Sequence, residues 1–124
     1  MFKIKKDIKK NRLYITLSGI FPISEAKKAK EIIIKEIDEL QSNFDVINDI
    51  SQFIRGQDEA GKILQDIMLL LIDRKVNMII RVIGESKTGL LQFANYSLQI
   101  ETYKLKYLPT LEEAEKFLDA KPLK

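Results

Sequence analysis

Residues 44–50 read FDVINDI, and this short stretch decides which fold the chain can adopt. It is rich in apolar and β-branched residues and turns polar at Asp49, which is typical of a central strand buried on both faces. Over residues 60–72, apolar residues recur at spacings of three and four, which predicts an amphipathic helix. A buried strand followed by such a helix indicates an α/β fold.

The residues before this strand predict two further strands and a helix. Apolar and polar residues alternate over 2–5 and again over 13–18, which indicates two half-buried strands joined by a tight turn. We expect Gly19 to end the second of these strands. Apolar residues then recur with helical spacing over 26–40, and Ser24 is the expected N-cap of that helix.

The residues after the second helix predict two more pairs of strand and helix. Residues 78–83 are mostly apolar and are followed by Gly84, which indicates another strand. A third helix is expected over 86–98. An edge strand is expected over 103–107, where apolar or aromatic residues alternate with lysines. The sequence TLEE at 110–113 matches a capping box and so predicts the start of the last helix.

The predicted order of elements is therefore β-β-α-β-α-β-α-β-α. Strands that alternate with helices imply right-handed crossovers, so we expect a mostly parallel mixed sheet covered by helices. The length of 124 residues fits a single domain over 1–124. No apolar run approaches the roughly 18 residues of a membrane span, and the first residues do not resemble a signal peptide. We therefore expect a cytoplasmic protein.

The chain contains no Cys and no His, which excludes thiolate chemistry, disulfides and the commonest general base and metal ligand. Asp45 and Asp49 lie on one side of the expected central strand, and Asp58 and Glu59 follow near its carboxyl end. These four carboxylates are candidates for acid–base chemistry or Mg²⁺ binding. Nothing in the sequence supplies a partner base, a nucleophile or an oxyanion donor at a recognisable spacing. We therefore predict no catalytic residue, no metal site and no cofactor, and a chain that is not an enzyme.

The first twelve residues concentrate the positive charge of the chain. The net charge of the whole sequence is +3, whereas residues 1–12 hold six basic side chains and one acidic side chain. The basic residues are Lys3, Lys5, Lys6, Lys9, Lys10 and Arg12. Such a patch can make weak contact with an anionic membrane surface. Nucleic acid is not an expected partner, because the patch lacks interleaved aromatic residues that would stack on bases.

Four segments give the chain a resemblance to a known family: residues 15–19, which end in glycine; residues 49–51, which read DIS; residues 82–84; and residues 108–114. In this order the chain resembles the STAS domain, the fold of SpoIIAA-like bacterial anti-sigma-factor antagonists and of regulatory tails on sulfate transporters. The resemblance implies a non-enzymatic regulatory module that binds a protein partner.

The chain departs from this family where signalling members carry a serine that a partner kinase phosphorylates. The corresponding residues 55–61 read RGQDEAG, and no Ser or Thr occurs between Ser51 and Ser86. The chain is therefore most similar to a divergent branch that lacks the phosphorylatable serine. Either Asp58 is simply an N-cap of the helix, or Asp58 or Glu59 mimics the phosphorylated state. The expected partner-binding residues are Asp49, Ser51, Arg55, Gly56, Asp58, Glu59 and Gly61.

An alternative function follows from the apolar run at 67–72, which is more apolar than a single core-facing stripe requires. Such a helix is most often covered on more than one side. It can also form a contact in a homodimer, or line a cavity for a small molecule or lipid. The runner-up prediction is thus a small-molecule or lipid carrier with a cavity beside the second helix.

Overall fold

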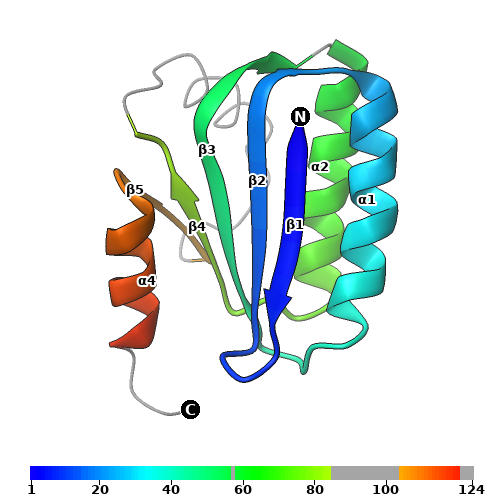
Figure 1. Ribbon diagram of the computed structural model, residues 1–124. Coiled ribbons are helices and arrows are strands. Elements are labelled where there is room, and N and C mark those ends of the chain that lie inside the picture. The colour runs from blue at the N-terminus through cyan, green and yellow to red at the C-terminus, as the bar shows by residue number, and fades with distance from the viewer. Residues whose placement is uncertain (57, 85–103, 121–124) are drawn as a thin grey trace.

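The computed structural model describes residues 1–56, 58–84 and 104–120, without the side chains of Arg55 and Asp58. These residues form five strands and three helices, arranged as in Figure 1. The strands are β1 (Phe2–Asp7), β2 (Arg12–Phe21), β3 (Asp45–Gly56), β4 (Met78–Val82) and β5 (Leu105–Leu108). The helices are α1 (Ile23–Ile37), α2 (Asp58–Asp73) and α4 (Leu111–Asp119). The helix predicted over 86–98 lies outside the described residues.

The five strands form one sheet in the order β1-β2-β3-β4-β5. Strand β1 runs antiparallel to β2, and the other neighbouring strands run parallel. The α/β fold with a mostly parallel mixed sheet is therefore confirmed, and β5 lies at an edge as expected. Because β3 is the middle strand, its first half is shielded by strands on both sides and by helices on both faces (Figure 1).

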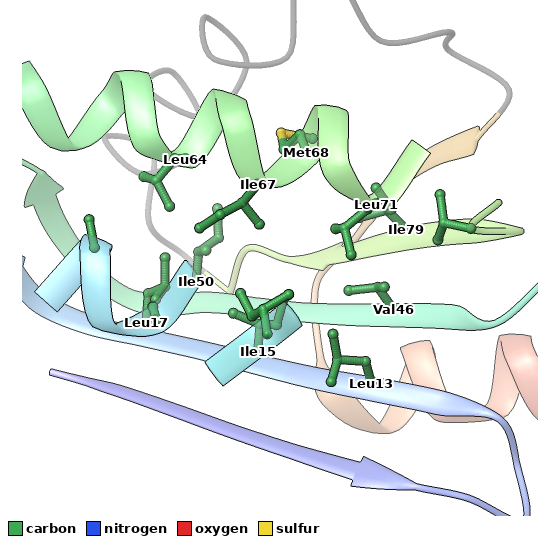
Figure 2. Close-up of a cluster of buried hydrophobic side chains, with 14 of the residues drawn as sticks. Leu13, Ile15, Leu17, Val46, Ile50, Leu64, Ile67, Met68, Leu71 and Ile79 are labelled. Carbon is green, nitrogen blue, oxygen red and sulfur yellow. The ribbon is translucent and has the colours of Figure 1, made fainter. Parts of the chain in front are cut away.

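Helices α1 and α2 lie side by side on one face of the sheet and enclose the main hydrophobic core. Figure 2 shows Leu64, Ile67 and Leu71 of α2 pointing toward the strands. On the strands, the side chains of Leu17 and Ile50 are 1% and 0% exposed. Burying one such aliphatic side chain is worth about 1.5–3 kcal/mol, so this layer supplies a large apolar contribution to stability.

Helix α4 lies on the opposite face of the sheet, against β3, β4 and β5 (Figure 1). Its buried residues, Ala114 and Leu118, form a smaller cluster with Ile47 of β3. The predicted capping box is confirmed in part, because Thr110 Oγ1 accepts a hydrogen bond from the backbone N–H of Glu113 at 3.1 Å. This cap fixes where α4 begins.

The predicted N-cap of the first helix, Ser24, is wrong. Helix α1 begins at Ile23, and its N-cap is Pro22, which makes no side-chain capping bond. The carbonyl oxygen of Pro22 accepts the first helical hydrogen bond, from Ala26 N at 3.1 Å. Pro22 already has φ −77° and an extended ψ of 163°, so the N-cap lies two residues before the predicted one and Ser24 falls inside the helix.

The predicted end of the central strand, at residue 50, is also wrong. Strand β3 runs for 12 residues, to Gly56. Its pairing with β4 ends at Asp49, opposite Val82, whereas its pairing with β2 continues as far as Gly56, opposite Phe21. Residues 18–21 and 52–56 thus form a two-stranded β2–β3 extension beyond the end of β4 (Figure 1).

Gly19 does not end β2, contrary to the prediction. It adopts φ +66°, next to a register shift at which one residue of β2 opposes two of β3. Glycine tolerates this left-handed conformation at low cost, so the strand pair absorbs the shift and continues. The extra residue of this bulge is Ile54 of β3, and Gly19 lies opposite it on β2, where the β2–β3 extension begins.

Candidate functional site

Asp49 and Ser51, two of the predicted partner-binding residues, form a local turn inside β3. Asp49 Oδ1 accepts hydrogen bonds from Ser51 N at 3.0 Å and from Ser51 Oγ at 2.6 Å. The register with β2 shifts at the same place, since Thr16 opposes Asp49 but Ser18 opposes Gln52. Asp49 therefore stabilises a bulge, and this matches the structural hydrogen-bonding role that its position suggests.

Gly84, which follows β4, packs directly on this bulge. A Cβ atom at Gly84 would lie 2.9 Å from Ser51 Cβ, and the residue has φ +54°. Both features require glycine, because a side chain would meet Ser51 and would also be strained at this φ. This contact holds the end of β4 against Ser51, at the place where the pairing between β3 and β4 ends.

The β2–β3 extension exposes two large apolar side chains. Ile20 is 51% exposed and Ile54 is 58% exposed, whereas Phe21 and Phe53 beside them are buried. Because side chains alternate along a strand, the two isoleucines point away from the face that carries α1 and α2. Sequence reasoning missed both residues, because the bulges interrupt the period-two pattern and the strands were expected to end earlier.

The start of α2 follows the β2–β3 extension directly. Glu59 is exposed, while Gly56 and Gly61 are buried. The side chains of Arg55 and Asp58, both predicted to bind the partner, lie outside what the structure describes. The predicted set therefore splits in two, since Ser51 precedes Gly56 by five strand residues, a separation of about 17 Å along β3.

The basic residues of the N-terminal segment do not form one cationic surface. Lys6 forms ion pairs with Glu36 of α1 and with Glu39 in the turn after it, and these hydrogen bonds raise the pKa of Lys6 above its usual value. Arg12 is only 3% exposed and binds Glu115 and Asp119 of α4. Lys10 lies 3.4 Å from Asp119. Three of the six basic groups are thus neutralised by acidic side chains of helices, which leaves less charge for an anionic surface.

A cavity of about 30 Å³ lies between the sheet and α2. Its wall is apolar apart from Asn48 and Arg81, and it holds space for one or two water molecules. Burial of the Arg81 guanidinium lowers its pKa, and Arg81 Nη1 donates a hydrogen bond to Tyr107 Oη at 3.2 Å. Known ligand pockets start near 300 Å³, so this cavity does not favour the carrier alternative.

Asp45 and Asp49, two of the carboxylates considered for catalysis or Mg²⁺, do not converge. Asp45 accepts a hydrogen bond from Asn77 Nδ2 at 2.8 Å, at the start of β3, and Asp49 is bound by Ser51 farther along the strand. Among the described residues, no three His, Cys, Asp or Glu side chains are placed to share a metal ion. Within the same residues, no helix is both long and apolar enough to span a membrane.

Solved structures with the same fold include two forms of one regulatory protein. The anti-sigma-factor antagonist SpoIIAA in its unphosphorylated form superposes with a TM-score of 0.69 and 13% identity, covering 98% of this chain and 100% of that one. Phosphorylated Bacillus SpoIIAA superposes with a TM-score of 0.66 and 12% identity, covering 95% of this chain and 99% of that one. An uncharacterised protein of the DUF3478 family from Shewanella loihica PV-4, which has a SpoIIAA-like fold, superposes with a TM-score of 0.71 and 8% identity. The match covers 95% of this chain and 92% of that one.

Identities of this size establish the fold and nothing finer. No protein-family model matches the sequence, and no curated protein matches it. The comparison nevertheless extends over nearly the whole chain, and it confirms the resemblance that the four short sequence segments suggested. The chain therefore has the STAS-like fold of SpoIIAA.

Proposed function

We propose that this chain is a non-enzymatic regulatory module that binds a protein partner in the bacterial cytoplasm. The fold that it shares with an anti-sigma-factor antagonist supports a regulatory role. The surface that we assign to the partner combines the β2–β3 extension with the start of α2. This docking surface comprises Ile20, Ile54 and Glu59, together with the sequence neighbours Arg55 and Asp58.

The exposure of Ile20 and Ile54 carries this proposal. Two large aliphatic side chains more than half exposed on adjacent strands cost free energy in water unless another surface covers them. Protein interfaces typically place apolar residues at the centre and charged residues at the rim. Glu59, which is exposed at the first turn of α2, is suited to such a rim.

We further propose that binding does not depend on serine phosphorylation at this joint. The sequence offers no Ser or Thr between Ser51 and Ser86, and Ser51 Oγ is engaged by Asp49 at 2.6 Å. A carboxylate at the first turn of α2 is placed favourably with respect to the helix dipole and needs no kinase to supply its charge. On this proposal, Asp58 or Glu59 supplies the negative charge that a phosphate supplies in a phosphorylated relative.

The test is affinity capture from a lysate of the native host, with wild-type protein and two variants compared by quantitative mass spectrometry. Ile54→Glu places a charge at the centre of the docking surface. Ile8→Glu is the matched control, because Ile8 is 64% exposed in the turn between β1 and β2. We expect a protein that wild type and Ile8→Glu retain and Ile54→Glu loses. If Ile54→Glu retains the same proteins as wild type, the docking surface is wrongly assigned.

The partner identified in this way then tests the role of the charge by calorimetry. We expect Asp58→Asn combined with Glu59→Gln to weaken binding about fivefold to tenfold, which corresponds to about 0.5–0.7 kcal/mol for each exposed charge. Glu112→Gln combined with Glu113→Gln, at the first turn of α4, should leave the affinity unchanged. If the two double variants weaken binding equally, the phosphate-mimic role is rejected, whereas the proposed contact through Ile20 and Ile54 is not affected.

A further inference from the structure

A groove separate from the docking surface lies on the face of the sheet that carries α4. Its volume is about 300 Å³, ten times that of the cavity beside α2 and within the range of small-molecule sites. Helix α4 packs on β3, β4 and β5, and among the described helices it is the one on this face. The groove therefore lies where α4 stops and the polar residues of β1 and β2 begin.

Opposite charges line the two sides of this groove. Lys3 and Lys5 lie on β1, and Asp49 lies on β3, two strands away. The register places Lys3, Thr16 and Asp49 in one row across the sheet, so the backbones of Lys3 and Asp49 are about 10 Å apart. Neither lysine forms an ion pair with any described residue.

Asp49 retains an acceptor for a ligand. Both of its hydrogen bonds from Ser51 end on Oδ1, so Oδ2 is the carboxylate oxygen to which a ligand can donate. Thr16, a small residue with a hydroxyl group, lies between Asp49 and Lys3 and leaves the row hollow at its middle. The row thus has a cationic end, a polar middle and an anionic end.

The remaining wall of the groove is fixed and partly apolar. Tyr14 Oη donates to Glu115 Oε1 at 2.8 Å, and Arg12 neutralises the same carboxylate. The ammonium group of Lys5 lies 4.9 Å from the centroid of the Tyr14 ring. Leu111, at the edge of the groove, is 45% exposed although it is a large apolar residue. An apolar group bound between Tyr14 and Leu111 would remove this surface from water.

We propose that this groove binds a small zwitterion of the α-amino acid class with an apolar side chain. The carboxylate of the ligand lies between Lys3 and Lys5, and its ammonium group donates to Asp49. Its side chain covers Leu111. A simple anion would be repelled by Asp49 and a simple cation by the two lysines, so a ligand with both charges fits this charge pattern better than either.

The test is a titration of the ¹⁵N-labelled protein, followed by amide chemical shifts, with three probes that share a phenyl group. L-Phenylalanine carries both charges, 3-phenylpropanoate carries only the carboxylate, and 2-phenylethylamine carries only the ammonium group. We expect saturable shifts at Thr16 and Asp49, and an affinity for L-phenylalanine about tenfold above that of either other probe. Equal affinities for the three probes, or no saturable shifts with L-phenylalanine, would overturn the proposal.

Two variants test the assignment from opposite charges. Lys3→Met should reduce the affinity for L-phenylalanine but leave the affinity for 2-phenylethylamine almost unchanged. Asp49→Asn should also reduce the affinity for L-phenylalanine, but it should leave the affinity for 3-phenylpropanoate almost unchanged. Lys9→Met is the matched control, because Lys9 is exposed in the turn outside the groove. The amide spectrum shows whether each variant is folded. If only one of the two variants folds, that variant alone is sufficient to test the site. A loss of affinity in Lys9→Met equal to that in Lys3→Met would reject the site.

Discussion

On β2, Leu13 and Ile15 face α1 and α2, whereas their neighbours Arg12 and Tyr14 face α4. The first face is closed by aliphatic side chains (Figure 2). The second face holds α4 through a smaller apolar cluster and also through polar contacts, in which Arg12 and Tyr14 bind Glu115. The same strand thus takes part in two kinds of attachment, one non-directional and one dependent on charge and geometry.

This difference indicates that one face of the sheet mainly stabilises the fold and that the other face is available for binding. Burial of apolar area supplies most folding free energy and tolerates little change in shape, so the α1 and α2 face is suited to hold the fold. The α4 face keeps Lys3 and Lys5 exposed and Asp49 half-buried, so a ligand can reach these charged groups. We therefore expect substitutions on the two faces to differ in size and in their response to pH.

The largest effect is expected from Ile50→Ala, which removes a fully buried side chain from the α1 and α2 face. It should lower the free energy of unfolding by about 2–5 kcal/mol, because apolar transfer and a new cavity both contribute. Thr16→Ala, on the opposite face, should cost about 1 kcal/mol or less. Urea denaturation followed by circular dichroism measures both. Similar losses for the two variants would remove the distinction between the faces.

A smaller effect is expected at the start of α4. Thr110→Ala deletes the acceptor for Glu113 N and should cost about 1 kcal/mol, with faster amide exchange in α4. Ser24→Ala makes the same kind of change in α1, where the serine is not the cap, and should cost about 0.5 kcal/mol or less. Urea denaturation measures the loss of unfolding free energy in both variants, and hydrogen exchange measures the opening of each helix. A larger loss for Ser24→Ala would show that the serine supports α1 in another way.

The strands and helices with regular patterns could be predicted from the sequence. Alternation over 13–18 identified both faces of β2, and the TLEE sequence located the start of α4, because each signal depends on residues close in the chain. The ends of β2 and β3 could not be predicted, since they depend on how two strands distant in sequence pair. Gly19 illustrates this, because the same glycine can end a strand or lie opposite a bulge in the neighbouring strand.

The candidate sites were predicted less well than the fold. Asp49 and Ser51 were identified by position, but their mutual hydrogen bonds and their separation from Gly56 follow from the length of β3. Ile20 and Ile54 gave no signal, because an isoleucine in a strand is ordinarily buried and exposure depends on which neighbours are present. The groove combines residues from β1, β2, β3 and α4, and only the three-dimensional arrangement shows them together.

The smallest effect concerns the pH dependence of the α4 attachment. The hydrogen bond from Arg12 lowers the pKa of Asp119 below its ordinary value of 3.8. A carboxylate with a lowered pKa in the folded state stabilises the protein fully above its unfolded pKa, and this stabilisation is lost as the pH falls through the folded pKa. The excess stability of wild type over Asp119→Asn should therefore be present at pH 6 and shrink below pH 3.8.

Urea denaturation of both proteins between pH 6 and pH 2.5 provides the measurement. Because the Asp119 side chain is 48% exposed, solvent screens the pair, and 1 M salt should diminish the same difference at pH 6. A matched titration of Ile50→Ala against wild type should show a large difference that changes little with pH, since no ionisable group is removed. If the Asp119→Asn difference is equally insensitive to pH and salt, the Arg12–Asp119 ion pair does not contribute to the attachment of α4, and this part of the contrast between the two faces is wrong.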